Sequence, residues 1–165
     1  MKKYELTAEF IEKWGKKLFR IKALISFGSV EAGELGGYVE KEDNLAQDGD
    51  AWVYGNAEVC GNARVYGNAR VYGDAEVCDD ADYLLIGRIG SRFSFTTFFK
   101  NKDKGITVSC GCFLGTIAEF RAKVTDTHGN NKHAKMYNLA ADMAELQILG
   151  EEHFDKLNTN KSEPF

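Results

Sequence analysis

Hydrophobic and polar positions repeat with a period of six residues between Val53 and Asp82. Five consecutive hexads read VYGNAE, VCGNAR, VYGNAR, VYGDAE and VCDDAD, each with valine first and alanine fifth. A period of six is not a multiple of 3.6, so a helix could not keep the valines on one side. Gly-Asn and Gly-Asp accept positive φ, which favours short strands separated by tight turns. The pattern predicts stacked short strands with the valines inside; the alternative is a twisted meander of short hairpins.

The run VYGNAEVCGNARVYGNA resembles the hexapeptide repeats of left-handed parallel β-helix proteins. In that family three hexads form one turn, so the resemblance implies that residues 18 apart are neighbours on adjacent turns. The outer faces of such a helix carry different chemistry: Trp52, Tyr54, Arg70 and Tyr72 on the first, Glu58, Cys60, Glu76 and Cys78 on the second, and an Arg64–Asp82 ion pair on the third.

The flanking patterns divide the chain into four expected parts. Residues 1–32 form a helix-and-strand cap, with a short helix over residues 7–14 that begins at Thr7. Residues 33–86 form the repeats, and Val39 and Leu45 belong to their core. Residues 87–150 form a ββαα lobe, and residues 151–165 form a polar tail.

The ββαα lobe is expected from two alternating runs, RFSFTTFFK and GITVSCGC, followed by two helical patterns. Thr116 and Glu119 form a capping box that opens the first helix, and Gly129 ends it. The second helix has an apolar stripe that is expected to be buried and comprises Met136, Leu139, Ala140, Met143 and Leu146. The fold class is therefore mainly β with α, a short left-handed parallel β-helix plus a C-terminal ββαα lobe.

The segment from Ser91 to Tyr137 is similar to a module found behind hexapeptide repeats in uncharacterised proteins of bacteriophages and prophages. That resemblance implies no catalytic residues. It implies a phage-type protein in the host cytoplasm, with a counter-defence role as one form of its activity.

Composition narrows the classes of partner. The net charge of −4 gives no general attraction to nucleic acid or to anionic membranes. The N-terminus lacks the apolar region of a signal peptide, and no apolar run approaches the ~20 residues of a membrane span. The four cysteines are then expected to be reduced thiols in a cytoplasmic protein. Cys110 and Cys112 are expected to be buried and inert on the core face of a strand.

Two sets of side chains are candidates for ligand binding. Aromatic rings beside an arginine could grip a flat ligand, or could pack against a partner subunit. Arginines in RIGSR and basic residues in THGNNKH could form an anion pocket if they converge, or could be ordinary solvated residues. The candidate residues are Trp52, Tyr54, Arg70, Tyr72, Arg88, Ser91, Arg92, His128 and Lys132. Glu58, Cys60, Glu76 and Cys78 could hold a metal, but two glutamates under a basic group of a partner is the favoured interpretation, and no metal or cofactor is predicted.

Three functions remain open. The favoured one is a non-catalytic protein that sequesters a small anionic, nucleotide-like ligand or docks on a host protein. The second is a structural role as a trimerisation device, and a homo-oligomer, preferably a trimer, is expected in either case. The third is a coenzyme A-dependent acyltransferase, which is disfavoured because His128, His133 and His153 all lie outside the repeats. No membrane or general nucleic-acid binding is expected.

Overall fold

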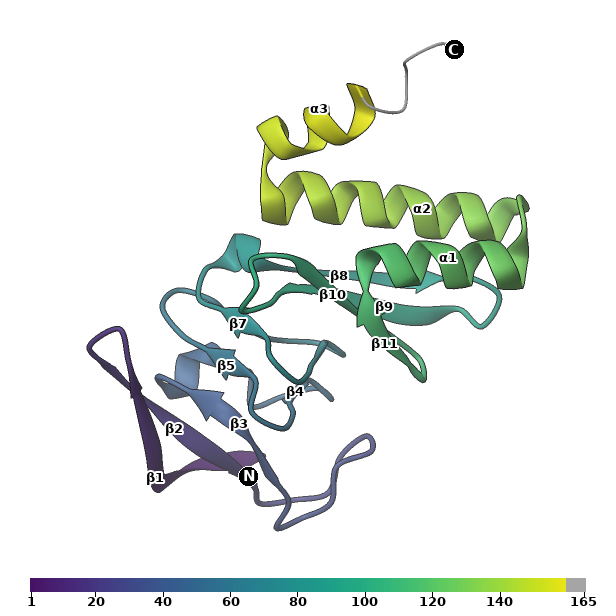
Figure 1. Cartoon of the computed structure of the whole chain (residues 1–165). Coiled ribbons are helices and arrows are strands. Elements are labelled where there is room, and N and C mark those ends of the chain that lie inside the picture. The colour runs from purple at the N-terminus through teal and green to yellow at the C-terminus, as the bar shows by residue number, and fades with distance from the viewer. Residues whose placement is uncertain (160–165) are drawn as a thin grey trace.

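The computed structural model describes residues 1–159 as a mixed α/β protein (Figure 1). An antiparallel N-terminal hairpin lies at one end, and the repeat segment, residues 51–82, lies in the middle. A four-stranded antiparallel sheet covered by helices lies at the other end.

The N-terminal hairpin and the repeat segment share a five-stranded mixed sheet in the order β1-β2-β3-β5-β7. β1, β2 and β3 pair antiparallel, whereas β3, β5 and β7 pair parallel. β4 and β6 form a separate parallel pair. The strands are β1 (Tyr4–Lys13), β2 (Lys16–Ala23), β3 (Leu35–Val39), β4 (Trp52–Val53), β5 (Glu58–Val59), β6 (Arg70–Val71) and β7 (Glu76–Val77), with single 3₁₀ turns at Glu42–Asn44 and Asp80–Asp82.

Residues 18 apart in the repeat segment are hydrogen-bonded neighbours. Trp52 pairs with Arg70, and Glu58 pairs with Glu76. The side chains of all five repeat valines are 0% exposed, which confirms that they point inward, and Val39 and Leu45 join the same core as expected.

The classification as a left-handed parallel β-helix protein is nevertheless wrong. Among the named strands, parallel pairing involves only β3 and four strands of two residues each, with one isolated parallel bridge between Leu45 and Val65, while the long strands are all antiparallel. The physical reason is the small number of repeats. Five hexads make fewer than two turns, so elements outside the repeat, including Tyr4, Ile21 and Phe99, must complete the core around the valines.

The helix expected over residues 7–14 is also wrong, because this segment lies in β1. The β1–β2 turn contains Trp14 and Gly15, both with positive φ, and fixes a tight hairpin. Tyr4 at the start of β1 is fully buried, and its hydroxyl donates to the carbonyl oxygens of Glu42 and Leu45. The buried ammonium of Lys3 donates to the Ala51 carbonyl at 2.9 Å. These long-range contacts override the weak helical pattern.

The two strands and two helices expected in the C-terminal part are present, but the ββαα description is incomplete because two further strands extend the sheet and a third helix follows. The strands β8, β9, β10 and β11 form one antiparallel meander, and helices α1, α2 and α3 follow it. The capping box of Thr116 and Glu119 opens α1 as expected. The bounds are β8 (Tyr83–Ile89), β9 (Ser94–Lys100), β10 (Ile106–Cys110), β11 (Phe113–Thr116), α1 (Ile117–His128), α2 (Lys132–Ala144), a π-helical turn (Glu145–Leu149) and α3 (Glu151–Thr159).

The C-terminal sheet separates two cores. Phe99 on β9 joins the core of the repeat segment, while its neighbour Phe98 packs with α1 and α2. Successive strand residues point to opposite faces, so one face of the sheet closes the end of the repeat segment and the other carries the helices (Figure 1).

The buried face of α2 differs from the expected stripe. Its buried side chains are mainly alanines, while Leu139 and Met143 are 63% and 56% exposed. Small side chains let α2 lie close to the sheet and to α1, which turns the larger apolar residues outward. The expected polar tail is helical up to Thr159, and residues 160–165 lie outside the described part of the chain.

Candidate functional site

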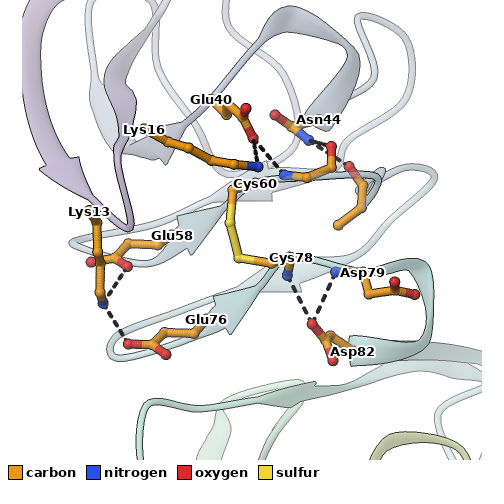
Figure 2. Close-up of a disulfide and its surroundings, with 12 residues drawn as sticks. Lys13, Lys16, Glu40, Asn44, Glu58, Cys60, Glu76, Cys78, Asp79 and Asp82 are labelled. Carbon is orange, nitrogen blue, oxygen red and sulfur yellow. Dashed lines mark hydrogen bonds and ion pairs between the residues drawn. A yellow bond between two sulfur atoms is a disulfide. The ribbon is translucent and has the colours of Figure 1, made fainter.

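The second face of the repeat segment is closed by covalent and ionic links (Figure 2). Cys60 and Cys78 form a disulfide with a Cα–Cα distance of 4.3 Å, so the expectation of four reduced thiols is wrong. The 18-residue register places the two cysteines on adjacent strands, which makes the bond possible. The two stacked glutamates do lie under a basic group, but that group is Lys13 of the same chain.

Lys13 lies 2.7 Å from a carboxylate oxygen of Glu58 and 2.5 Å from one of Glu76. Burial by itself lowers the pKa of Lys13, but the hydrogen bonds to both glutamates outweigh burial and raise it. Together with the disulfide, this leaves neither thiolates nor unpaired carboxylates for a metal on this face. Its role is to tie the N-terminal hairpin to two turns of the repeat segment.

Reduction of the Cys60–Cys78 disulfide is expected to destabilise the protein by about 3 kcal/mol, because the bond closes a loop of 18 residues. Chemical denaturation with and without a phosphine reductant measures this difference. The Cys60→Ala/Cys78→Ala variant should match the reduced protein and ignore reductant, whereas Cys112→Ala, which removes an exposed free thiol, should behave as the parent does. An unchanged midpoint after reduction of the parent would contradict the role of the bond.

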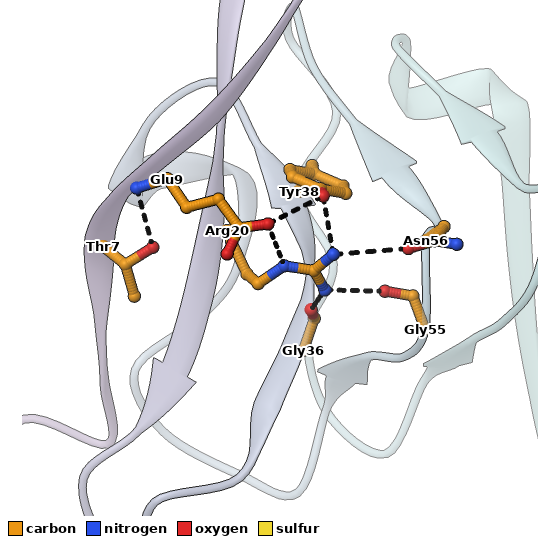
Figure 3. A network of polar contacts seen from close by, with 7 residues as sticks. All are labelled: Thr7, Glu9, Arg20, Gly36, Tyr38, Gly55 and Asn56. Atoms are coloured by element: carbon orange, nitrogen blue, oxygen red, sulfur yellow. Dashed lines mark hydrogen bonds and ion pairs between the residues drawn. The ribbon is translucent and has the colours of Figure 1, made fainter.

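A second polar network fastens the hairpin to β3 and to the turn at Gly55 and Asn56 (Figure 3). The Arg20 guanidinium donates to the carbonyl oxygen of Gly36 at 2.7 Å and to that of Gly55 at 3.3 Å. It also contacts the Tyr38 hydroxyl and pairs with Glu9. Arg20 therefore has its donors satisfied within the chain and acts as a structural residue.

The aromatic residues of the first face have separate environments. The rings of Tyr54 and Tyr72 are stacked, with centroids 4.2 Å apart. Trp52 is fully buried and packs edge-on against Tyr4 and Phe27, so it is not available to a ligand or to a partner subunit. The pKa of the Tyr72 hydroxyl is raised, mainly by burial and to a smaller extent by the neighbouring Tyr54. Arg70 lowers this pKa but does not outweigh the other two.

Arg70 lines a cleft of about 420 Å³ between the repeat segment and the C-terminal sheet. Arg88 and Arg92 line the same cleft from the β8–β9 hairpin, so three of the predicted ligand residues come together. We call this the arginine cleft. Its lining residues are Asn68, Arg70, Arg88, Arg92, Phe93, Ser94, Phe95, Thr97, Ser109 and Gly111.

The charges of the arginine cleft are not neutralised within the described chain. No carboxylate lines it, and over residues 1–159 none of its three arginines is within ion-pair distance of an acidic group. Ser109, which is 5% exposed as a residue, lines the same cleft from β10. The Phe93 ring, which is 70% exposed, stands at the rim.

The other predicted ligand residues do not reach the cleft. Ser91 is exposed in the β8–β9 turn, and Lys132 is exposed at the start of α2. The His128 ring stacks on Tyr137 at the helix-covered face of the sheet, with centroids 5.7 Å apart. Burial raises the pKa of Tyr137 to about 12. Arg88 and Arg92 line the arginine cleft, whereas His128 and Lys132 are not among its lining residues, so this cleft brings together only the first half of the expected pocket.

Two further expectations are corrected at this end of the molecule. Cys110 faces the helices beside Val108 as expected, but Cys112 lies in the β10–β11 turn and is exposed. Asp82 pairs with Lys100 instead of Arg64, because the 3₁₀ turn at Asp80–Asp82 ends the repeat register.

Sequence alone missed Phe93, Ser94 and Ser109 as cleft residues. The alternation of the RFSFTTFFK run indicates which residues share a face, but it does not show that this face meets the repeat segment.

A scan of the chain against protein-family profiles found no match, and a comparison with curated protein sequences found none either. Over residues 1–159, no helix is both long enough and apolar enough to cross a membrane.

Proposed function

We propose that the protein binds a small phosphate-bearing, nucleotide-like ligand in the arginine cleft. The observation that carries this proposal is the set of three arginines without carboxylate partners that line one cleft. A guanidinium is planar and can donate two parallel N–H hydrogen bonds, which matches the positions of two oxygens of a phosphate. The volume of about 420 Å³ lies within the usual range for small-molecule sites, roughly 300–1,000 Å³.

Neutral groups in the cleft fit the rest of such a ligand. The Ser109 hydroxyl belongs to a residue that lines the cleft and can donate a hydrogen bond to such a ligand. Phe93 at the rim offers a flat face on which a base can stack. A ligand that combines phosphate with a flat ring would use both the hydrogen-bonding groups and the Phe93 ring. Inorganic phosphate would use only the hydrogen-bonding groups.

The direct test is calorimetric titration at low salt with ADP, inorganic phosphate and adenosine. ADP is expected to bind most tightly, phosphate more weakly and adenosine weakest of all. The Arg88→Gln/Arg92→Gln variant is expected to weaken ADP binding at least about 100-fold, because it removes two charged hydrogen bonds that each contribute about 1.5–3 kcal/mol. Phe93→Ala should weaken ADP binding and leave phosphate binding unchanged.

Arg64→Gln is the matched control. Arg64 stands in the same hexad position as Arg70, but it lies outside the arginine cleft. If Arg64→Gln reduces ADP binding as much as Arg88→Gln/Arg92→Gln does, general charge attraction accounts for the binding and the proposal fails. It also fails if neither ADP nor phosphate binds at millimolar concentration.

A further inference from the structure

The outer face of α2 and the following turn carries a continuous apolar stripe. Met136, Leu139, Met143 and Leu146 are spaced by three, four and three residues, which places them on one side of a helix. Leu139, Met143 and Leu146 are 63%, 56% and 45% exposed. We call these four residues the α2 stripe.

The α2 stripe is not covered by the helix that follows it. After Gly150, where φ is +90°, the chain doubles back and α3 runs beside the end of α2 (Figure 1), yet Leu139, Met143 and Leu146 stay at least 45% exposed. None of the described residues of α3 is buried. The stripe therefore remains open over the described chain, which is unusual for apolar residues at coiled-coil spacing.

Charge is distributed unevenly along this face. Lys132 and Lys135 lie in the first turn of α2 and are exposed, whereas Glu151 and Glu152 are exposed beyond its far end. A second helix of the same sequence is complementary to this one only when it runs antiparallel. A parallel neighbour would place lysine beside lysine and glutamate beside glutamate.

We propose that the α2 stripe is a docking surface for a second copy of this chain, arranged antiparallel about a two-fold axis. An axis between Leu139 and Met143 places Leu139 of each copy on Met143 of the other. The same axis places Met136 on Leu146 and brings Lys132 next to Glu151. A single position of the two-fold axis therefore aligns both the apolar pairs and the charge pair. An isologous interface requires this, because both copies contribute the same residues.

The expected dimer is weak and reversible. A single helix pair buries less than the roughly 1,200 Å² of a standard interface, so we expect a dissociation constant of the order of 100 μM at low salt. Sedimentation equilibrium of the full chain over a range of concentrations measures it. The Leu139→Glu/Met143→Glu variant should remain monomeric throughout, while Leu114→Glu, at an exposed leucine on β11, should dimerise as the parent does.

A charge exchange tests the antiparallel arrangement. Lys132→Glu and Glu151→Lys should each weaken the dimer several-fold, and the double variant should restore it. A full chain that stays monomeric at about ten times the expected dissociation constant overturns the proposal. So does a dimer that persists in Leu139→Glu/Met143→Glu. Association that appears only after residues 160–165 are deleted would assign the stripe to the end of the same chain and would also overturn it.

Discussion

Val65→Asp is expected to abolish the cooperative folding of the protein. Val65 is fully buried at the centre of the repeat segment and pairs in parallel with Leu45. Its backbone N–H donates to the Asn44 carbonyl oxygen at 2.9 Å, so the backbone cannot turn the new carboxylate outward without loss of that bond. An unpaired charge among buried valines costs at least about 4 kcal/mol, which approaches the whole stability of a domain at the lower end of the usual range of roughly 5–15 kcal/mol. Thermal unfolding followed by circular dichroism measures the loss.

Asn56→Asp is the control for this prediction. It adds the same charge in an exposed turn of the repeat segment, where the Asn56 side-chain oxygen already accepts a hydrogen bond from Arg20. We expect its unfolding temperature to equal that of the parent or to exceed it slightly. A cooperative transition in Val65→Asp at the temperature of the parent would mean that Val65 does not face the interior.

Gly61→Ala is expected to cost about 3 kcal/mol, although it adds a single methyl group. Gly61 has a φ of +60°, which disfavours any side chain, and a Cβ atom there would collide with the carbonyl oxygen of Cys78 on the adjacent turn. The strain of positive φ contributes about 1 kcal/mol, and displacement of the backbone contributes the rest. Urea denaturation gives the difference.

Gly73→Ala separates these two contributions. Gly73 has the same position in its hexad and a φ of +65°, but no atom lies within 4 Å of a Cβ built on it. We therefore expect a cost of only about 1 kcal/mol. Equal losses in the two variants would show that close approach of the neighbouring turn does not matter at Gly61.

The interior of the repeat segment could be predicted because its pattern is local and exact in spacing. Each valine recurs after six residues, and a period of 18 for vertical neighbours follows once three hexads form a turn. The flanks have no such repetition. The burial of Tyr4 and the hydrogen bonds of Lys3 join residues more than 35 apart, and these contacts decide that residues 4–13 form a strand.

The arginine cleft was only partly predictable for a related reason. Arg70 was predicted to act with neighbouring aromatic rings, and Arg88 and Arg92 with basic residues of THGNNKH, so two separate sites were expected for them. They meet because β9 packs on the end of the repeat segment, where the Thr97 hydroxyl accepts a hydrogen bond from the backbone N–H of Arg70. The spacing of residues within the repeat segment or within the C-terminal sheet does not show how these two parts pack against each other.

The antiparallel strands at both ends of the repeat segment have a consequence for self-assembly. Short parallel strands expose backbone N–H and C=O groups that could add further chains without limit. β2 occupies the free edge of β3, and an antiparallel bridge between Ala75 and Asn101 blocks the opposite end. The parallel strands of the repeat segment are thereby covered at both ends, which removes the sites at which a second repeat segment could stack in register.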